Sequence, residues 1–244
     1  MNNRTETLLK AALLIGLGLM LYEKITSGTL GFYINARFAW LTYVGAMLFI
    51  ALGLGLVGRL MSQRSAAPEL SPAATRLSWP AVGLMALPLA LGLLIPARPL
   101  GAGAIAAKGV GLTAPGSAGG ATSLRRAQTG PKNILDWLRE FSSTPDPSTL
   151  TGQPVDVTGF VYRDARNAPN QIWVSRFTIS CCVADASAIG LLAQVDSSFD
   201  QKSDQWVRVT GKLGVTTFAG EKVPVILPDK IEPIPPPDQP YLYP

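Results

Sequence analysis

The sequence predicts a membrane-anchored α+β protein, with about three N-terminal transmembrane helices, a flexible tether, and a small C-terminal β-barrel preceded by a short helix. Three observations carry this prediction. The chain is 48% hydrophobic and only 15% charged, and the apolar excess lies in long runs before residue 100. After residue 150, apolar and polar residues alternate with a period of two, as in β-strands. After Arg98, both patterns give way to a stretch rich in Gly, Ala and Ser.

Two uncharged apolar runs, residues 39–58 and 77–97, are long enough to cross a bilayer. A helix rises about 1.5 Å per residue, so about 20 residues cross a hydrocarbon core of about 30 Å. We therefore expect membrane spans near residues 39–60 and 78–96.

A shorter apolar run, residues 11–22, is either the hydrophobic part of a secretory signal peptide or another membrane helix. Arg4 and Lys10 would supply the basic segment of a signal peptide, but no small-x-small cleavage site follows in "YEKITSG". We therefore favour an uncleaved span near residues 7–23. The transmembrane region then covers residues 1–97.

The next segment, residues 98–132, shows neither strand alternation nor a helical apolar stripe. A chain of this composition buries too little surface to order itself, which predicts a flexible tether. The barrel domain follows at residues 133–244 and begins with a short amphipathic helix in "PKNILDWLREF". Strands are expected near residues 154–162, 171–182, 188–195, 205–213 and 223–232.

Five strands in about 80 residues are typical of a small closed barrel. Two of them carry a similar phrase, "VDVTGFVY" and "VRVTGKLG", in which Gly159 and Gly211 follow an alternating segment. A glycine inside a strand often marks a bend or bulge where the strand curls around a barrel. We therefore predict an oligonucleotide/oligosaccharide-binding (OB) type of barrel, with a five- or six-strand sandwich as the alternative.

The charge distribution argues against nucleic-acid binding, although the chain is basic overall. Residues 1–132 hold 12 of the 21 Lys and Arg but only 3 of the 16 Asp and Glu, whereas residues 133–244 hold 9 bases and 13 acids. An acidic barrel is a poor partner for phosphates. The basic surplus belongs to the loops beside the spans, where it meets anionic lipid of the bilayer.

The only two cysteines, Cys181 and Cys182, are adjacent at the end of a predicted strand. Because neighbouring side chains of a strand point to opposite faces, we expect one thiol in the core and the other at the surface with Asp185. Cys182 and Asp185 would form an incomplete metal site, since zinc requires four ligands. Zinc or another thiophilic metal is therefore a possible ligand, and a capped turn is the alternative.

The end of the chain, "PPPDQPYLYP", is predicted to be an ordered contact segment. Tyr241 and Tyr243 are too apolar to lie in water without a packing partner, so they close the barrel or present an edge to another protein. Enzyme chemistry is not expected. The chain has no histidine to activate a cysteine and no phosphate-binding glycine motif before a helix.

Four phrases together resemble the YcgQ-type family of permease subunits: "SGTLGFYINARFAWLTYVG", "RFTISCCVADASAIGLL", "WVRVTGKL" and "PPDQPYLYP". The resemblance implies a membrane-anchored OB-like domain that works beside a separate multi-spanning permease of the YcgR type. Some relatives carry a histidine-rich loop between the second and third spans that suggests transition-metal handling. Here that loop, "RLMSQRSAAPELSPAATRL", holds no such cluster, which weakens the metal interpretation.

Two functions are therefore open: an accessory permease subunit whose barrel docks on or gates the permease, for a metal or thiophilic solute, and a membrane-tethered scaffold that binds another protein. With a cytoplasmic N-terminus, three spans place the barrel outside the cell membrane. The basic residues near the spans favour this orientation by one charge. On the inside they are Arg4, Lys10, Arg59, Arg64 and Arg76, and on the outside Lys24, Arg37, Arg98 and Lys108.

Overall fold

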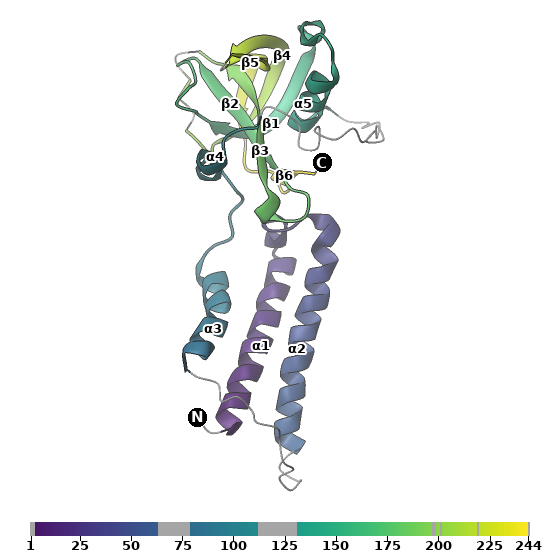
Figure 1. Cartoon of the computed structure of the whole chain (residues 1–244), viewed down its shortest axis with the longest axis vertical. Helices are drawn as coiled ribbons and strands as arrows, with labels where there is room; N and C mark the ends of the chain where they lie inside the picture. The colour runs from purple at the N-terminus through teal and green to yellow at the C-terminus, as the bar shows by residue number, and fades with distance from the viewer. Residues whose placement is uncertain are drawn as a thin grey trace. The chain divides into compact units, whose positions relative to one another are not determined.

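The protein folds into two compact units, Met1–Arg98 and Pro99–Pro244 (Figure 1). The computed structural model describes residues 3–62, 79–111, 131–196, 199–200, 202–218 and 220–243. The first unit is helical and the second is built on a β-sheet, so the chain is an α+β protein as predicted.

The helices of the N-terminal unit lie where the sequence predicts membrane spans. They are α1 (Asn3–Thr26), the 3₁₀ turns η1 (Thr29–Phe32) and η2 (Ala36–Phe38), α2 (Ala39–Ser62) and α3 (Trp79–Leu94). Within the described residues, one helical stretch, Ala36–Ser62, is long and apolar enough to cross a membrane, while α3 is a shorter apolar helix of 16 residues. The loop between α2 and α3, residues 63–78, lies outside the described residues.

Small residues allow α1 and α2 to pack closely and antiparallel. A Cβ on Gly18 would lie 3.0 Å from the carbonyl oxygen of Ala46, and one on Gly53 would lie 3.1 Å from that of Ala11. Such close approach of backbones is typical of helix pairs in membranes. Large apolar side chains of α2, including Met47, point away from this contact and are exposed, as expected of a lipid-facing surface.

The C-terminal unit contains the five predicted strands and a short sixth one. They are β1 (Pro154–Tyr162), β2 (Gln171–Thr178), β3 (Ser187–Gln194), β4 (Trp206–Phe218), β5 (Glu221–Pro233) and β6 (Tyr241–Leu242). Their order is β1-β4-β5-β3-β2-β6, and β1 also pairs with β2. The first five strands therefore form a closed ring of pairings. The β3–β5 and β2–β6 pairs are parallel and the others antiparallel.

The short predicted helix is α5 (Ile134–Ser143), and a capping box begins it. The Asn133 side chain accepts the backbone N–H groups of Leu135 and Asp136, while the Asp136 carboxylate accepts that of Asn133. This arrangement satisfies donors that the first helical turn leaves unpaired. The apolar face of α5 is buried with Leu150 of η3 (Pro147–Leu150) and the inward residues of the strands in the main core.

The two strand glycines, which the sequence predicts to mark bends or bulges, both lie where a side chain would meet the backbone of a neighbouring strand. The β4–β5 register shifts at Thr210 and Gly211, and a Cβ on Gly211 would lie 2.2 Å from the Leu227 carbonyl oxygen. The predicted irregularity at this glycine is therefore confirmed. At Gly159 the added Cβ would lie 2.7 Å from the Ser175 carbonyl oxygen, where β1 leaves β4 and meets β2.

The prediction that residues 98–132 form a flexible tether is wrong for its first part. Helix α4 (Ala102–Lys108) belongs to the C-terminal unit, and Ile105 is fully buried in a cluster with aromatic residues of the strands. Gly111 extends this contact, because its N–H donates to a main-chain carbonyl of β3 at 2.8 Å. These tertiary contacts order a segment whose composition predicts disorder. Residues 112–130 of the predicted tether lie outside the described residues.

Candidate functional site

Cys181 and Cys182 lie in the loop between β2 and β3, not in a strand. β2 ends at Thr178, four residues before the predicted end. The carboxylate of Asp185 accepts the backbone N–H groups of Ser180 at 3.0 Å and Cys181 at 2.7 Å, and these bonds turn the chain away from the strand direction. The turn-capping alternative for Asp185 is therefore confirmed.

The prediction that one cysteine is buried in the core is also wrong. Cys181 is exposed and Cys182 is half-buried. The prediction assumed the alternating geometry of a strand, which ends before the pair. Beyond it, the short 3₁₀ turn η4 (Val183–Asp185) follows Cys182 directly, and the two Sγ atoms lie 3.7 Å apart.

The cysteine loop, residues 179–186, holds the Cys181 thiol in its protonated form. The pKa of Cys181 is raised to about 11, first by its hydrogen bond to the Asp185 carboxylate and second by that to Cys182. The backbone N–H of Cys181 is the main cause that lowers the pKa of Asp185. A protonated thiol is a weak nucleophile, so the loop is poorly suited to covalent catalysis.

The loop offers two sulfur ligands and no larger ligand cluster. Within the described residues, no group of three or more His, Cys, Asp or Glu side chains is placed to hold a metal ion. The predicted pair of Cys182 and Asp185 therefore does not form a complete site on this chain. Any ion at the loop would need ligands from water or from another molecule.

The C-terminal tail is ordered, as predicted. β6 pairs with the end of β2, where Tyr241 lies opposite Phe177, and Ile179 N–H donates to the carbonyl of Leu242 at 3.0 Å. Tyr241 is 2% exposed, and its hydroxyl accepts the backbone N–H of Leu100 at 2.8 Å. Tyr243 is half-buried and packs against the cluster that contains Ile105 and the strand aromatics. Because Leu242 bonds to Ile179, the tail lies beside the start of the cysteine loop.

Sequence reasoning missed Arg176, which fastens the tail to β2. Its Nε donates to the carbonyl of Pro240 at 3.1 Å, a second guanidinium nitrogen donates to Gln239, and the group lies 5.5 Å from the ring centre of Trp206. Burial lowers the pKa of Arg176 to about 10. The available signal was a single charged residue in the apolar strand "QIWVSRFTIS".

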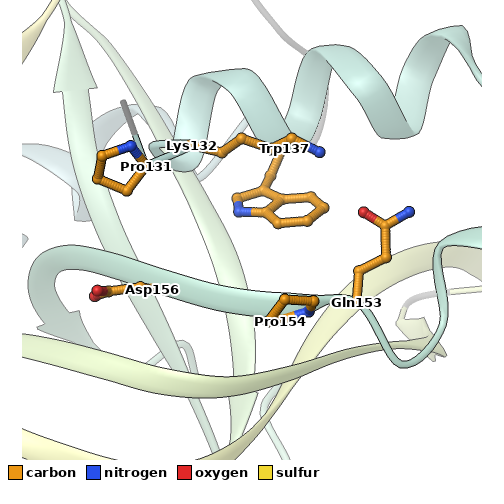
Figure 2. A pocket seen from close by; sticks show the side chains of 6 residues that line it. All are labelled: Pro131, Lys132, Trp137, Gln153, Pro154 and Asp156. Atoms are coloured by element: carbon orange, nitrogen blue, oxygen red, sulfur yellow. The ribbon is translucent and has the colours of Figure 1, made fainter. Parts of the chain in front are cut away.

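A shallow groove of about 240 Å³ lies between the start of α5 and the start of β1 (Figure 2). The Trp137 ring projects into it from α5, and its Nε1–H has no hydrogen-bond partner among the described residues. The two charges at the groove are already compensated, Lys132 by Glu140 and Asp156 by Arg208. The lining residues are Pro131, Lys132, Trp137, Gln153, Pro154 and Asp156.

Comparison with known proteins assigns the chain to a family. The DUF1980 N-terminal domain matches residues 9–111, and the DUF1980 C-terminal domain matches residues 121–244. The chain belongs to the DUF1980 family. The N-terminal match includes α4, and the C-terminal match includes the cysteine loop and the tail of this DUF1980 protein.

Two curated proteins resemble this DUF1980 chain. It is 31% identical over 99 residues to "UPF0703 protein YcgQ" of Bacillus subtilis (strain 168), a match that covers 40% of the chain and 35% of that protein. It is 25% identical over 255 residues to a Streptococcus mutans protein named "Putative two-component membrane permease complex subunit", with 89% of the chain and 92% of that protein covered. The predicted membership of the YcgQ-type family is confirmed.

Proposed function

We propose that this protein is a non-enzymatic accessory subunit of a two-component membrane permease complex. The observation that carries the proposal is the similarity to the Streptococcus mutans permease-complex subunit along nearly the full length of both chains. The apolar helix Ala36–Ser62 supports a place in the bilayer. The protonated Cys181 thiol and the absence of histidine from the sequence support a role other than catalysis.

The C-terminal sheet is, on this proposal, an OB-like barrel. The closed ring β1-β4-β5-β3-β2-β1, with a parallel β3–β5 pair, is the strand order expected of this five-stranded Greek-key barrel. The register shift at Gly211 supports the proposal, because an irregularity of this kind lets a strand bend as closure of the barrel requires. In a sandwich of two separate sheets, this ring of pairings would be broken at two places.

The barrel docks on or gates a multi-spanning permease of the YcgR type through the cysteine loop and the tail. Cys181, Cys182 and Asp185 lie on the loop, and the half-buried Tyr243 is the tail tyrosine that a partner can reach. Tyr241, the other predicted contact, is buried in the core and holds the tail in place instead. The two elements are neighbours at the end of β2, so together they form one continuous candidate surface. The exposed thiol supports a metal or another thiophilic solute as the transported species.

Purification in a mild detergent tests the partner. A multi-spanning permease recovered in fixed stoichiometry with the full-length protein is the expected result. A different stable partner and no permease would instead support a membrane-tethered protein-binding scaffold. Removing residues 239–244 should weaken the recovery of the permease, because it removes the tail half of the proposed surface.

We further propose three membrane spans, near residues 7–23, 39–60 and 78–96, and an extracytoplasmic barrel. A reporter fused after Pro244 tests this topology. Alkaline phosphatase is expected to be active and a cytoplasmic fluorescent reporter dark. The opposite pattern would contradict the proposed side of the membrane.

A further inference from the structure

We infer that Cys181 and Cys182 together form a two-sulfur chelate for a tetrahedral thiophilic cation, with zinc as the representative ion. The inference deepens the proposed function, because it names the chemical class of the solute and the groups on this chain that contact it. It rests on the geometry of the cysteine loop, which places the two Sγ atoms in contact, 3.7 Å apart.

The distance between the sulfurs is the first argument. Zinc–sulfur bonds of about 2.3 Å at a tetrahedral angle place two sulfurs about 3.8 Å apart. The two Sγ atoms lie 3.7 Å apart. The present spacing is that of a thiol–thiol hydrogen bond. A tetrahedral ion could therefore bind both sulfurs with almost no movement of either, whereas a linear two-sulfur ion with bonds of the same length would need about 4.6 Å between them. In a continuous strand the two side chains would point to opposite faces and could not share an ion.

Access and rigidity are the second argument. Cys181 is exposed and Cys182 half-exposed, so an ion reaches the sulfurs from solvent. Asp185 holds the loop in this shape through the N–H groups of Ser180 and Cys181, and the Asp185 N–H donates in turn to the carbonyl of Cys182 at 3.1 Å. The chelating groups are therefore held by main-chain bonds, with Asp185 as a positioning residue.

The incomplete ligand set is the third argument, and it indicates transfer rather than storage. Two sulfurs leave two of the four tetrahedral positions for water or for ligands from another molecule. Among the described residues no third ligand completes the cluster. An ion held this way can pass to a neighbour that offers more ligands, as delivery to a permease requires.

Binding is balanced by proton release. The ion forms two metal–sulfur bonds, and each thiol that becomes a thiolate releases one proton to the solvent. No electron is transferred. Both cysteines must already be reduced thiols, because a disulfide has no proton to release and no thiolate to offer the ion.

The test uses the full-length protein in detergent, reduced and without a polyhistidine tag. Because the sequence has no histidine, its two cysteines are the expected strong ligands. We expect one zinc ion per chain, up to two protons released per ion, and protection of both thiols from N-ethylmaleimide. Replacing either ligand by Cys181→Ser or Cys182→Ser should weaken zinc binding by more than about 100-fold, beyond the loss typical of a supporting residue.

The matched control is Ala184→Ser, which changes an exposed position of the same loop and leaves both thiols in place. Zinc binding by this variant should be unchanged, and magnesium, a hard cation, should not compete. Blocking both thiols of the unmodified protein with N-ethylmaleimide should abolish binding without any substitution.

Failure to bind zinc, or undiminished binding by a variant with both cysteines replaced, would overturn the chelate. Recovery of the permease is measured separately, in the presence of a chelator. A lost permease with retained zinc binding would contradict the proposed function alone, and the reverse result would contradict the chelate alone.

Discussion

Arg176 presents a guanidinium that is buried beneath the C-terminal tail and bonds to two of its carbonyl groups. A hydrogen bond to a charged group contributes about 1.5–3 kcal/mol to the free energy of unfolding. A methionine at this position would leave the two tail carbonyl groups without their guanidinium donor. We expect Arg176→Met to lower the free energy of unfolding of the C-terminal unit by about 2 kcal/mol. Denaturant unfolding followed by tryptophan fluorescence measures the loss.

Arg208→Met is the matched control for this prediction. Arg208 pairs with Asp156 at the surface, and an exposed ion pair contributes little to the free energy of unfolding, because water screens the two charges. The Arg176 variant should also expose the tail to carboxypeptidase, while the control should not. Equal effects of the two substitutions would show that Arg176 does not fasten the tail.

The pKa of the Cys181 thiol is raised to about 11, first because the Asp185 carboxylate accepts a hydrogen bond from the protonated form and second because of the hydrogen bond to Cys182. Asp185→Asn removes the charge that holds this proton, so the pKa should fall toward that of an ordinary thiol. The thiolate fraction at pH 8 then rises, by less than the about 100-fold that a fall of the pKa by two units would give, because Asp185 is one of several causes of the shift. Iodoacetamide labelling of a Cys182→Ser background measures the rate at Cys181.

The control for labelling is Asp229→Asn, which neutralises an exposed acid on β5. Its labelling rate should match that of the parent. A faster rate in this variant as well would mean that the overall charge, and not the Asp185 hydrogen bond, controls the thiol.

At the scale of elements, the packing of α1 on α2 depends on two glycines that face the partner helix. A Cβ on Gly53 would lie 2.6 Å from the Ile15 side chain and 3.1 Å from the Ala11 carbonyl, whereas one on Gly55 would meet nothing within 4 Å. Gly53→Val should therefore separate the helices and lower the melting temperature of the detergent-solubilised protein.

Gly55→Val makes the same chemical change two residues away on the same helix, where there is open space. Overpacking typically costs about 1–3 kcal/mol, and only the Gly53 variant should incur it. Similar melting temperatures for the two variants would show that the close contact between α1 and α2 does not stabilise the unit.

At the scale of the whole molecule, the C-terminal unit begins at Pro99, and only residues 95–98 separate it from α3. The predicted barrel boundary at residue 133 therefore omits the segment that carries α4. A fragment that begins at residue 131 lacks this segment. The Tyr241 hydroxyl then loses its hydrogen bond to Leu100, and the apolar side chains that pack around Ile105 become exposed to solvent.

We expect residues 99–244 to unfold at a clearly higher temperature than residues 131–244. Burying an isoleucine side chain contributes about 1.5–3 kcal/mol, and the Leu100 bond adds to it. Thermal melts of the two fragments measure the difference. Ile105→Ala in the longer fragment should lower its stability by about 2–5 kcal/mol, since it leaves a cavity. Identical melts for both fragments would restore the boundary at residue 133.

Much of the fold could be predicted because its signals are local. The starts of β1 and β2 were predicted to the residue, and α5 is recognisable from its apolar face and from Asn133 and Asp136. The conformation of the cysteine loop could not be predicted from strand alternation. Just after the end of β2, the Asp185 carboxylate accepts the N–H groups of Ser180 and Cys181 and turns the chain.

The sequence alone determined that the chain joins an apolar helical part to an acidic β-rich part and ends in an ordered tyrosine-containing tail, because run length, period and composition record burial locally. Only the tertiary structure decided that α4 belongs to the barrel unit, that Arg176 holds the tail, and that the two thiols lie side by side. The first two depend on contacts between residues that are distant in the chain, and the third depends on a turn that ends the strand alternation. Local periodicity carries no information about either kind of contact.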